Sequence, residues 1–326
     1  MPDLNQARVL VIGGAGLVGS HLVDRLIQEP VREILVLDNF VRGTHKNLAR
    51  AAQSDKVKIV HGDIRDRAKL AQLMADTDVV FLLAALWLGQ CVQDPRACVE
   101  VNVLGNFAVI EVAREAGVKK IVYSSSASVY GDALTKPMTE DHPFNNRTMY
   151  GAGKIAVEQF LRAFYTQYGL DYVAYRYMNI YGPRMDYKGT YVSVIMKVLD
   201  RIDQGLPPVI FGDGTQSYDF VHVADVARAN ILGATSQATD ESFNIGMGVE
   251  TTINELVGIL LELTHSNLKP EYRPQEQMFV SHRVGSTDKA ERLLGFKAKI
   301  PLYEGLRQLV EWRAQDMAQR QRDNDL

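Results

Sequence analysis

The sequence predicts an α/β protein built on a doubly wound parallel sheet. Through its first half, short apolar runs rich in β-branched residues alternate with amphipathic stretches, which is typical of βαβ units. A glycine-rich turn directly after the first apolar run further favours a Rossmann-type arrangement of that sheet. Strands are expected at residues 8–12, 33–37, 57–60, 79–83, 120–123 and 172–175.

Helical spacing of apolar residues fills the intervals between these strands. It predicts helices at 18–28, 68–75, 95–116 and 150–168. After about Tyr177 the pattern becomes irregular and is punctuated by the segments GPR, GLPP and FGDG. We therefore expect an NAD-binding Rossmann domain formed by residues 1–176 with about 221–247. A smaller C-terminal substrate lobe would comprise residues 177–220 and 248–326.

The composition argues against several classes of partner. The 326 residues carry a net charge of −3, so no basic surface for nucleic acid is expected. The longest apolar run, at 79–88, has about half the length of a membrane-spanning helix. No basic and apolar leader precedes the first strand, and only Cys91 and Cys98 could pair. We expect a cytoplasmic protein without a membrane partner, in which both thiols are reduced.

The glycine-rich turn has the spacing of a dinucleotide-binding site. Strand 8–12 runs into Gly13-Gly14-Ala15-Gly16-Leu17-Val18-Gly19, and a helical pattern follows. Glycine is needed here because the chain turns tightly and its backbone must approach a pyrophosphate, while the helix N-terminus offers free N–H groups. A glycine turn that binds nothing is the alternative, but the strand–turn–helix context favours a cofactor. The expected pyrophosphate contacts are Gly13, Gly16, Leu17, Val18 and Gly19.

Two acidic residues follow the next strands. Asp38 ends the second strand, where a carboxylate would bind the adenosine ribose and repel a 2′-phosphate. This position favours NAD over NADP, although a turn or cap role is the alternative and Arg42 nearby leaves NADP open. Asp63, followed by Ile64, would either bind the adenine amino group or cap the next helix.

Tyr150 and Lys154 stand four residues apart, which places both on one face of a helix. A phenol has a pKa of about 10 and is a poor base at neutral pH. A neighbouring ammonium and the positive charge of oxidised nicotinamide would both favour the phenolate, which can accept a hydroxyl proton. Such pairs are common on exposed helices, but this one follows a dinucleotide motif and Ser124-Ser125-Ser126 at the end of the fifth strand.

Together these motifs resemble those of the NAD-dependent epimerase/dehydratase family of extended short-chain dehydrogenases. The similarity extends to about Trp312. It is carried by the glycine motif, Asp38, Asp63-Ile64, Asn102, SSSASVYG at 124–131, Tyr150 with Lys154, RYMNIYGPR at 176–184, and residues 211–223.

The resemblance implies roles for individual residues. Tyr150 would be the base, Lys154 its electrostatic partner and a ribose ligand, and Ser126 a hydroxyl donor to the substrate. Asn102 would be a structural or cofactor-side residue, and Asn179 would contact the phosphates of a sugar nucleotide unless it only binds loop backbone. Turn chemistry is the alternative role for the first two serines. The remaining expected contacts are Asn39, Leu83, Ala84, Ala85, Ser124 and Tyr177 for the cofactor, and Phe211, Tyr218 and Arg283 for the substrate.

Three positions depart from the family pattern. Leu82 replaces the usual His of the fourth strand, and Met149 replaces the commoner Pro before the tyrosine. Tyr218 replaces an Arg that binds diphosphate in the family, so a bidentate cationic ligand is lost. Arg283 and Arg184 are candidate replacements, and Arg184 could equally be an ordinary surface charge.

The leading interpretation is an NAD-dependent nucleotide-sugar 4-epimerase. Tyr150 would remove a hydroxyl proton while NAD takes hydride, and the hydride would return after the sugar has turned. A dehydratase or decarboxylase needs a further acid or base just after Ser126, where Ala127 and Ser128 stand. A nucleotide-sugar dehydrogenase or reductase is the alternative. A non-catalytic NAD-binding regulator is disfavoured because it would not need these residues.

Apolar residues surround the predicted helix at 95–116 instead of forming one stripe. Such a helix must be covered on two sides, so we expect a two-fold homodimer that also involves the helix at 150–168. His21, His61 and His265 show no metal-ligand spacing, and no metal is expected.

Overall fold

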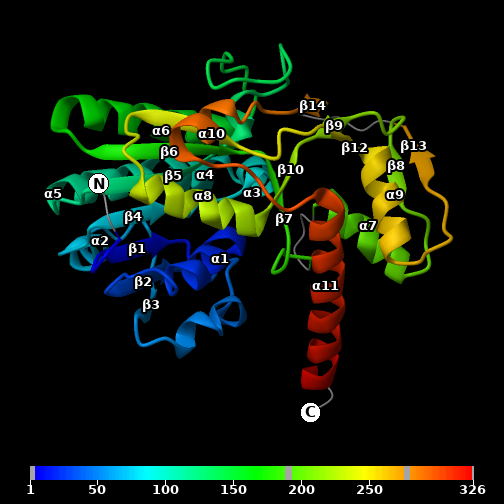
Figure 1. The fold of residues 1–326 in the computed structure, drawn as a ribbon, viewed down its shortest axis with the longest axis horizontal. Helices are drawn as coiled ribbons and strands as arrows, with labels where there is room; N and C mark the ends of the chain where they lie inside the picture. The colour runs from blue at the N-terminus through cyan, green and yellow to red at the C-terminus, as the bar shows by residue number, and fades with distance from the viewer. Residues whose placement is uncertain (1–3, 188–192, 275–279, 325–326) are drawn as a thin grey trace.

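A computed structural model describes residues 4–187, 193–274 and 280–324, and a parallel sheet lies at its centre (Figure 1). Within these ranges the main sheet has seven strands in the order β11-β6-β5-β4-β1-β2-β3. All neighbouring strands are parallel, so the predicted doubly wound α/β fold is confirmed. The strands are β1 (Arg8–Ile12), β2 (Glu33–Asp38), β3 (Val57–His61), β4 (Val79–Leu82), β5 (Lys120–Ser126), β6 (Asp171–Tyr177) and β11 (Glu241–Ile245).

Both faces of this sheet are buried by helices. Val9 and Val11 of β1 belong to one core, whereas Leu10 and Ile12 belong to the other. The first core includes side chains of α1 (Leu17–Leu26) and α8 (Val223–Thr235). The second includes side chains of α2 (Arg67–Met74), α5 (Asn106–Glu115) and α6 (Met149–Tyr168). Burial on two faces explains why the inner strands β1, β2 and β4 are continuous apolar runs without alternating polar residues.

The segment predicted as one helix at 95–116 differs from an ideal helix. It comprises α4 (Pro95–Cys98), a π-helical stretch η3 (Val99–Gly105) and then α5. A turn at Asp94 separates α4 from α3 (Leu88–Gln93) and brings the Cα atoms of Cys91 and Cys98 to 4.8 Å. The two cysteines form a disulfide, so the expectation of two reduced thiols is wrong in this structure.

The remaining elements form a second region beside the sheet, at the right of Figure 1. There α7 (Val194–Asp203), α9 (Ile253–Leu263) and α11 (Leu302–Asn324) share one apolar core. Three small sheets pair β7 (Asn179–Tyr181) with β10 (Phe220–His222), β8 (Val209–Phe211) with β13 (Glu271–Arg273), and β9 (Ser217–Tyr218) with both β12 (Thr251–Thr252) and β14 (His282–Arg283). The other elements are η1 (His45–Leu48), η2 (Ala51–Gln53), η4 (Ala127–Val129) and α10 (Asp288–Leu294).

α11 is a helix of 23 residues that runs down the centre of Figure 1. Its surface is largely polar, and no helix in the described parts of the chain is long and apolar enough to cross a membrane.

Candidate active site

A cavity of about 550 Å³ opens at the carboxyl ends of β1 and β4, where the strand order reverses. This is the place at which open parallel sheets bind ligands. Gly13 and Gly19 leave no room for side chains, because a Cβ on Gly13 would lie 2.8 Å from the Ala84 nitrogen and one on Gly19 would overlap the Gly13 carbonyl oxygen. A narrow backbone cradle at the start of α1 therefore borders an elongated cavity, which fits a dinucleotide.

Sixteen of the expected cofactor contacts line this cavity: Gly13, Gly16, Leu17, Val18, Gly19, Asp38, Asn39, Asp63, Ile64, Leu83, Ala84, Ala85, Ser124, Tyr150, Lys154 and Tyr177.

Asp38 is buried at the end of β2 and binds the glycine turn. Its two carboxylate oxygens accept hydrogen bonds from the amides of Ala15 and Phe40, both at 2.8 Å. A carboxylate has about four acceptor sites, so Asp38 can still accept bonds from ribose hydroxyls. Arg42 is engaged elsewhere: its guanidinium lies 4.6 Å from the centroid of the Trp87 ring and 3.6 Å from the Asp186 carboxylate.

Asp63 lies in the cavity wall and does not cap the next helix. Its carboxylate accepts two hydrogen bonds of 2.9 Å from the Arg65 guanidinium, which lower the pKa of Asp63. The cap of α2 is Asp66, whose side chain accepts from the Lys69 amide at 3.0 Å. The helix-cap alternative for Asp63 is therefore wrong.

Asn102 is 1% exposed and does not line the cavity. Its side chain accepts from the amide of Leu86 and donates to the carbonyl of Leu86, both at 2.7 Å. These bonds hold the loop after β4, from which Leu83, Ala84 and Ala85 reach the cavity. Of the two roles expected for Asn102, its position matches the structural one.

Tyr150 and Lys154 lie in the first turns of α6. Thr148 caps this helix by accepting from the Gly151 amide at 3.0 Å. The Lys154 ammonium donates to the carbonyl of Ser124 at 2.6 Å and lies 5.6 Å from the centroid of the Tyr150 ring. Burial lowers the pKa of Lys154 to about 7, against the opposing charge of Glu158. The pair is thus fixed against the end of β5.

Burial raises the pKa of Tyr150, and three neighbours oppose that rise. They are a hydrogen bond with Ser126 and the positive charges of Arg283 and Arg42. The Ser126 hydroxyl also accepts from the Ser128 amide at 3.1 Å. The Tyr150 phenol can act as a proton acceptor, and the Ser126 hydroxyl can act as a hydrogen-bond donor. Both can act on one oxygen atom of a bound ligand.

A second cavity, of about 950 Å³, meets the first at Tyr150. The two share Trp87, Ser125, Tyr150, Tyr177, Ile180 and Met185. Of the five residues predicted to contact the substrate, Arg283 does not line the second cavity, and the other four do: Ser126, Asn179, Phe211 and Tyr218. Among its described lining residues the only carboxylate is that of Asp200, which forms an ion pair with Arg313.

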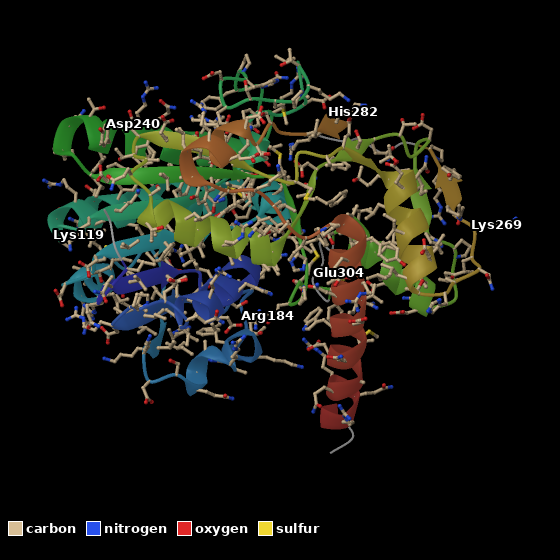
Figure 2. All side chains as sticks on the ribbon, in the orientation of Figure 1. Lys119, Arg184, Asp240, Lys269, His282 and Glu304 are labelled. Carbon is tan, nitrogen blue, oxygen red and sulfur yellow. A yellow bond between two sulfur atoms is a disulfide. The ribbon has the colours of Figure 1, made fainter. Side chains whose placement is uncertain are left out.

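Of the two residues considered as replacements for the lost diphosphate ligand, Arg283 lies beside Tyr218 and Arg184 does not. Tyr218 donates its hydroxyl to the carbonyl of Val280 at 2.9 Å. Arg184, which is labelled in Figure 2, forms an ion pair with Asp24 of α1. It lines the cofactor cavity and not the second one. Arg283 stands opposite Tyr218 where β14 pairs with β9.

Several residues of the site escaped sequence reasoning. Trp87 borders both cavities, while Gln216 and Arg273 line the second. Behind the serines, Arg176 and Glu158 form a buried ion pair of 2.7 Å. Glu158 follows Lys154 by one helical turn, so both lie on the same face of the helix. This spacing was the sequence signal that could have identified Glu158 as a residue of the site. Over residues 4–187, 193–274 and 280–324, no group of three or more His, Cys, Asp or Glu side chains could hold a metal ion.

Comparisons with known proteins agree with this geometry. Residues 9–246 match the model of the NAD dependent epimerase/dehydratase family. A putative UDP-glucose 4-epimerase from Methanocaldococcus jannaschii is 36% identical over 308 residues, which are 93% of this chain and 97% of that protein.

Solved structures are similar over almost the whole chain. A UDP-N-acetylglucosamine 4-epimerase from Methanobrevibacter ruminantium, in complex with UDP-N-acetylmuramic acid, has a TM-score of 0.90 and 34% identity, covering 97% of this chain and 100% of that one. A dTDP-glucose 4,6-dehydratase from Streptomyces venezuelae with NAD bound has a TM-score of 0.89 and 29% identity, covering 95% and 98%. The chain belongs to the NAD-dependent epimerase/dehydratase family.

Proposed function

We propose that the protein is a nucleotide-sugar 4-epimerase that acts by transient oxidation. The observation that carries this proposal is the position of Tyr150, which lies in the wall shared by both cavities, while Ser126 lines the second cavity. The epimerases among the relatives support the same reaction type.

The roles of the side chains follow from their contacts. Bound NAD supplies a hydride acceptor and donor. Tyr150 takes the proton of a sugar hydroxyl and returns it at the end of the cycle, while Ser126 donates a hydrogen bond to the same oxygen. Lys154 stabilises the phenolate through its charge and would also bind the nicotinamide ribose.

Reorientation of the sugar requires that most binding energy reside in the nucleotide. We propose that the nucleotide binds in the part of the second cavity lined by Phe211 and Gln216, where the Gln216 amide donates to the Phe211 carbonyl at 2.8 Å. We propose that residues 177–220 and 248–326 supply this substrate lobe. Residues 1–176 with about 221–247 would hold NAD.

Elimination and decarboxylation are disfavoured by the residues beside Ser126. Either reaction needs an acid or base in addition to the tyrosine. Ala127 is fully buried, and the Ser128 hydroxyl is too weak an acid or base for this step. The one carboxylate among the described lining residues, that of Asp200, is paired with Arg313. The site therefore suits a reaction limited to oxidation, reorientation and reduction.

The test is a thermal-shift screen of UDP-, dTDP-, GDP- and CDP-sugars, because ligands of the folded state raise its melting temperature. The best ligand is then incubated with the NAD-loaded protein. We expect a product of unchanged mass and altered configuration, with no accumulation of NADH. Loss of water or carbon dioxide by mass spectrometry would exclude epimerisation, and stoichiometric NADH would indicate a dehydrogenase.

We further infer a homodimer and a cytoplasmic location. Leu104 is 57% exposed and Val99 38% exposed on the helical stretch that includes η3. Phe107 of α5 packs edge-on against Phe160 and Phe164 of α6, so the two helices form one continuous surface. A symmetry-related copy of this surface would cover the exposed side chains. Cell fractionation would test the location.

A further inference from the structure

A third hollow, of about 280 Å³, adjoins the substrate cavity. Leu88 and Tyr218 line both spaces. Ser128 and Thr148 also line the hollow, and they lie two residues from Ser126 and Tyr150 respectively. Phe211 does not line it. The hollow therefore opens beside the reacting end of the substrate cavity and not beside the proposed nucleotide end.

Arg283 lies in the wall of this hollow with a guanidinium that no described residue satisfies. Its Nε is buried without a hydrogen-bond partner, and its side chain forms no ion pair within the described parts of the chain. Burial lowers its pKa to about 10, so the group stays charged at neutral pH. Arg283 as a whole is half-buried, but its Nε is shut off from water without a partner, and an anionic ligand at the guanidinium would offset the cost of this arrangement.

No charged or titratable neighbour in the described parts of the chain forms a hydrogen bond or ion pair with the side chain of Arg283. The groups that face it are the phenols of Tyr218 and Tyr150 and the carboxylate of Asp132. Asp132 accepts hydrogen bonds from the amides of Ser281 and His282, at 3.0 and 3.2 Å. Its carboxylate thus fixes the backbone at the start of β14 instead of binding the guanidinium.

The other charged group among the described lining residues is also a cation. Arg147 is exposed and makes no ion pair with a described residue. The Ser128 hydroxyl lies 3.1 Å from that of Ser126. No Asp or Glu is found among the described lining residues. Two guanidinium groups on one wall can together bind a carboxylate.

We propose that this hollow binds a carboxylate carried by the sugar ring, so that the preferred substrates are nucleotide-linked sugar acids. The proposal rests on the proposed function, because it requires a sugar nucleotide whose reacting carbon lies at Tyr150. In this proposal Arg283 binds the carboxylate of the sugar and not the diphosphate. Nucleotide sugars without a carboxylate, such as UDP-glucose, would therefore bind more weakly.

The test measures binding to NAD-loaded Tyr150→Phe protein, in which turnover is suppressed. UDP-glucuronic acid, UDP-glucose and UDP are titrated by calorimetry. We expect the acid to bind about tenfold or more tightly than UDP-glucose, because a bidentate charged pair is gained. Arg283→Met in the same background should abolish this preference. Arg162→Met, at an exposed position of α6, removes the same charge and should keep it.

Each other outcome has a defined meaning. If Arg283→Met weakens UDP as much as the sugar nucleotides, Arg283 is a diphosphate ligand and the proposal fails. Equal affinity for the acid and for UDP-glucose before that substitution also overturns it. Turnover of wild-type protein separates the two proposals. If the protein interconverts UDP-glucose and UDP-galactose but does not prefer the acid, the epimerase proposal holds and the carboxylate site is excluded. If the protein prefers the acid but catalyses no epimerisation, only the carboxylate-binding site is supported. If none of the three ligands binds, both the proposed function and the carboxylate site are wrong.

Discussion

The ammonium of Lys154 donates a 2.6 Å hydrogen bond to the carbonyl oxygen of Ser124. This contact joins α6 to the last residues of β5, and it thereby sets the position of Tyr150 relative to Ser126. The lysine is 3% exposed, so its charge is removed from solvent while it keeps this one strong acceptor.

Lys154 should make the stability of the protein depend on pH. Burial lowers its folded-state pKa to about 7, whereas an unfolded lysine titrates near 10.4. Between these values the unfolded chain binds a proton that the folded chain does not, so stability rises with pH through this window. Below pH 7 the full cost of the buried charge is present.

Denaturant unfolding from pH 6 to pH 10 would measure this effect. The unfolding free energy of wild type relative to Lys154→Met should increase with pH by up to a few kcal/mol. The same substitution at exposed Lys269 (Figure 2) controls for the loss of one positive charge. A difference between wild type and Lys154→Met that stays constant with pH would contradict the prediction.

Tyr150→Phe should lower turnover by roughly 10²- to 10⁴-fold, since it removes the proposed base. NAD binding and the melting temperature should be close to those of wild type, because only one hydroxyl is lost. Tyr123→Phe is the matched control: its hydroxyl is buried without a partner, and its ring lies 5.0 Å from the Lys154 ammonium. Activity of Tyr150→Phe within a few-fold of wild type would remove Tyr150 from the mechanism.

Asp38 should determine the preference for NADH over NADPH. Asp38→Ala removes the negative charge, so the discrimination between NADH and NADPH should be lost. It also removes the oxygens that accept hydrogen bonds from the Ala15 and Phe40 amides, so the free energy of unfolding should fall by about 1–3 kcal/mol. Asp38→Asn keeps an acceptor oxygen and should lose discrimination with a smaller change in stability. Fluorescence titration with both cofactors checks this, and tighter binding of NADPH by wild type would show that the assignment of Asp38 is wrong.

The main sheet was predictable because each strand is a short apolar run bounded by turns. The predicted strands at 8–12 and 33–37 correspond to β1 and β2, and the chain order of alternating elements fixes a parallel sheet. The cofactor cavity followed from the same logic, since the carboxyl ends of β1 and β4 must meet where the strand order reverses.

Other features depend on contacts that local patterns do not carry. The π-helical stretch at Val99–Gly105 shifts hydrogen bonding without changing the apolar character of the segment. The Cys91–Cys98 disulfide depends on the turn at Asp94, which a spacing of seven residues does not reveal. Arg184 pairs with Asp24 across 160 positions of sequence, so its partner could not be identified from its neighbours.

The proposed dimer should depend on the exposed apolar side chains of the helical stretch at 95–115. Leu104→Glu places a charge on this surface and should weaken association, because an unpaired charge cannot be buried at low cost. Val249→Glu, at a loop residue that is 54% exposed, is the control and should leave assembly unchanged. Light scattering at micromolar concentration measures the mass. A wild-type monomer would rule out the dimer.

The loop after β4 should couple Asn102 to cofactor affinity. Asn102→Ala leaves the amide and carbonyl of Leu86 without their partners, at a cost of about 1–3 kcal/mol for each unsatisfied group. We expect the loop to lose its fixed position and the affinity for NADH to fall by about tenfold, equivalent to 1.4 kcal/mol.

Turnover at saturating NAD should change much less, because Tyr150, Ser126 and Lys154 lie on β5 and α6 and make no hydrogen bond to this loop. Asn106→Ala is the matched control. Its side chain donates only to the helix carbonyls of Val101 and Asn102, at 3.1 and 3.2 Å, so it should lower stability without changing NADH affinity. Titration of NADH against each variant, with turnover measured at saturation, separates the two effects. A loss of turnover in Asn102→Ala with unchanged NADH affinity would instead place Asn102 in the reaction itself.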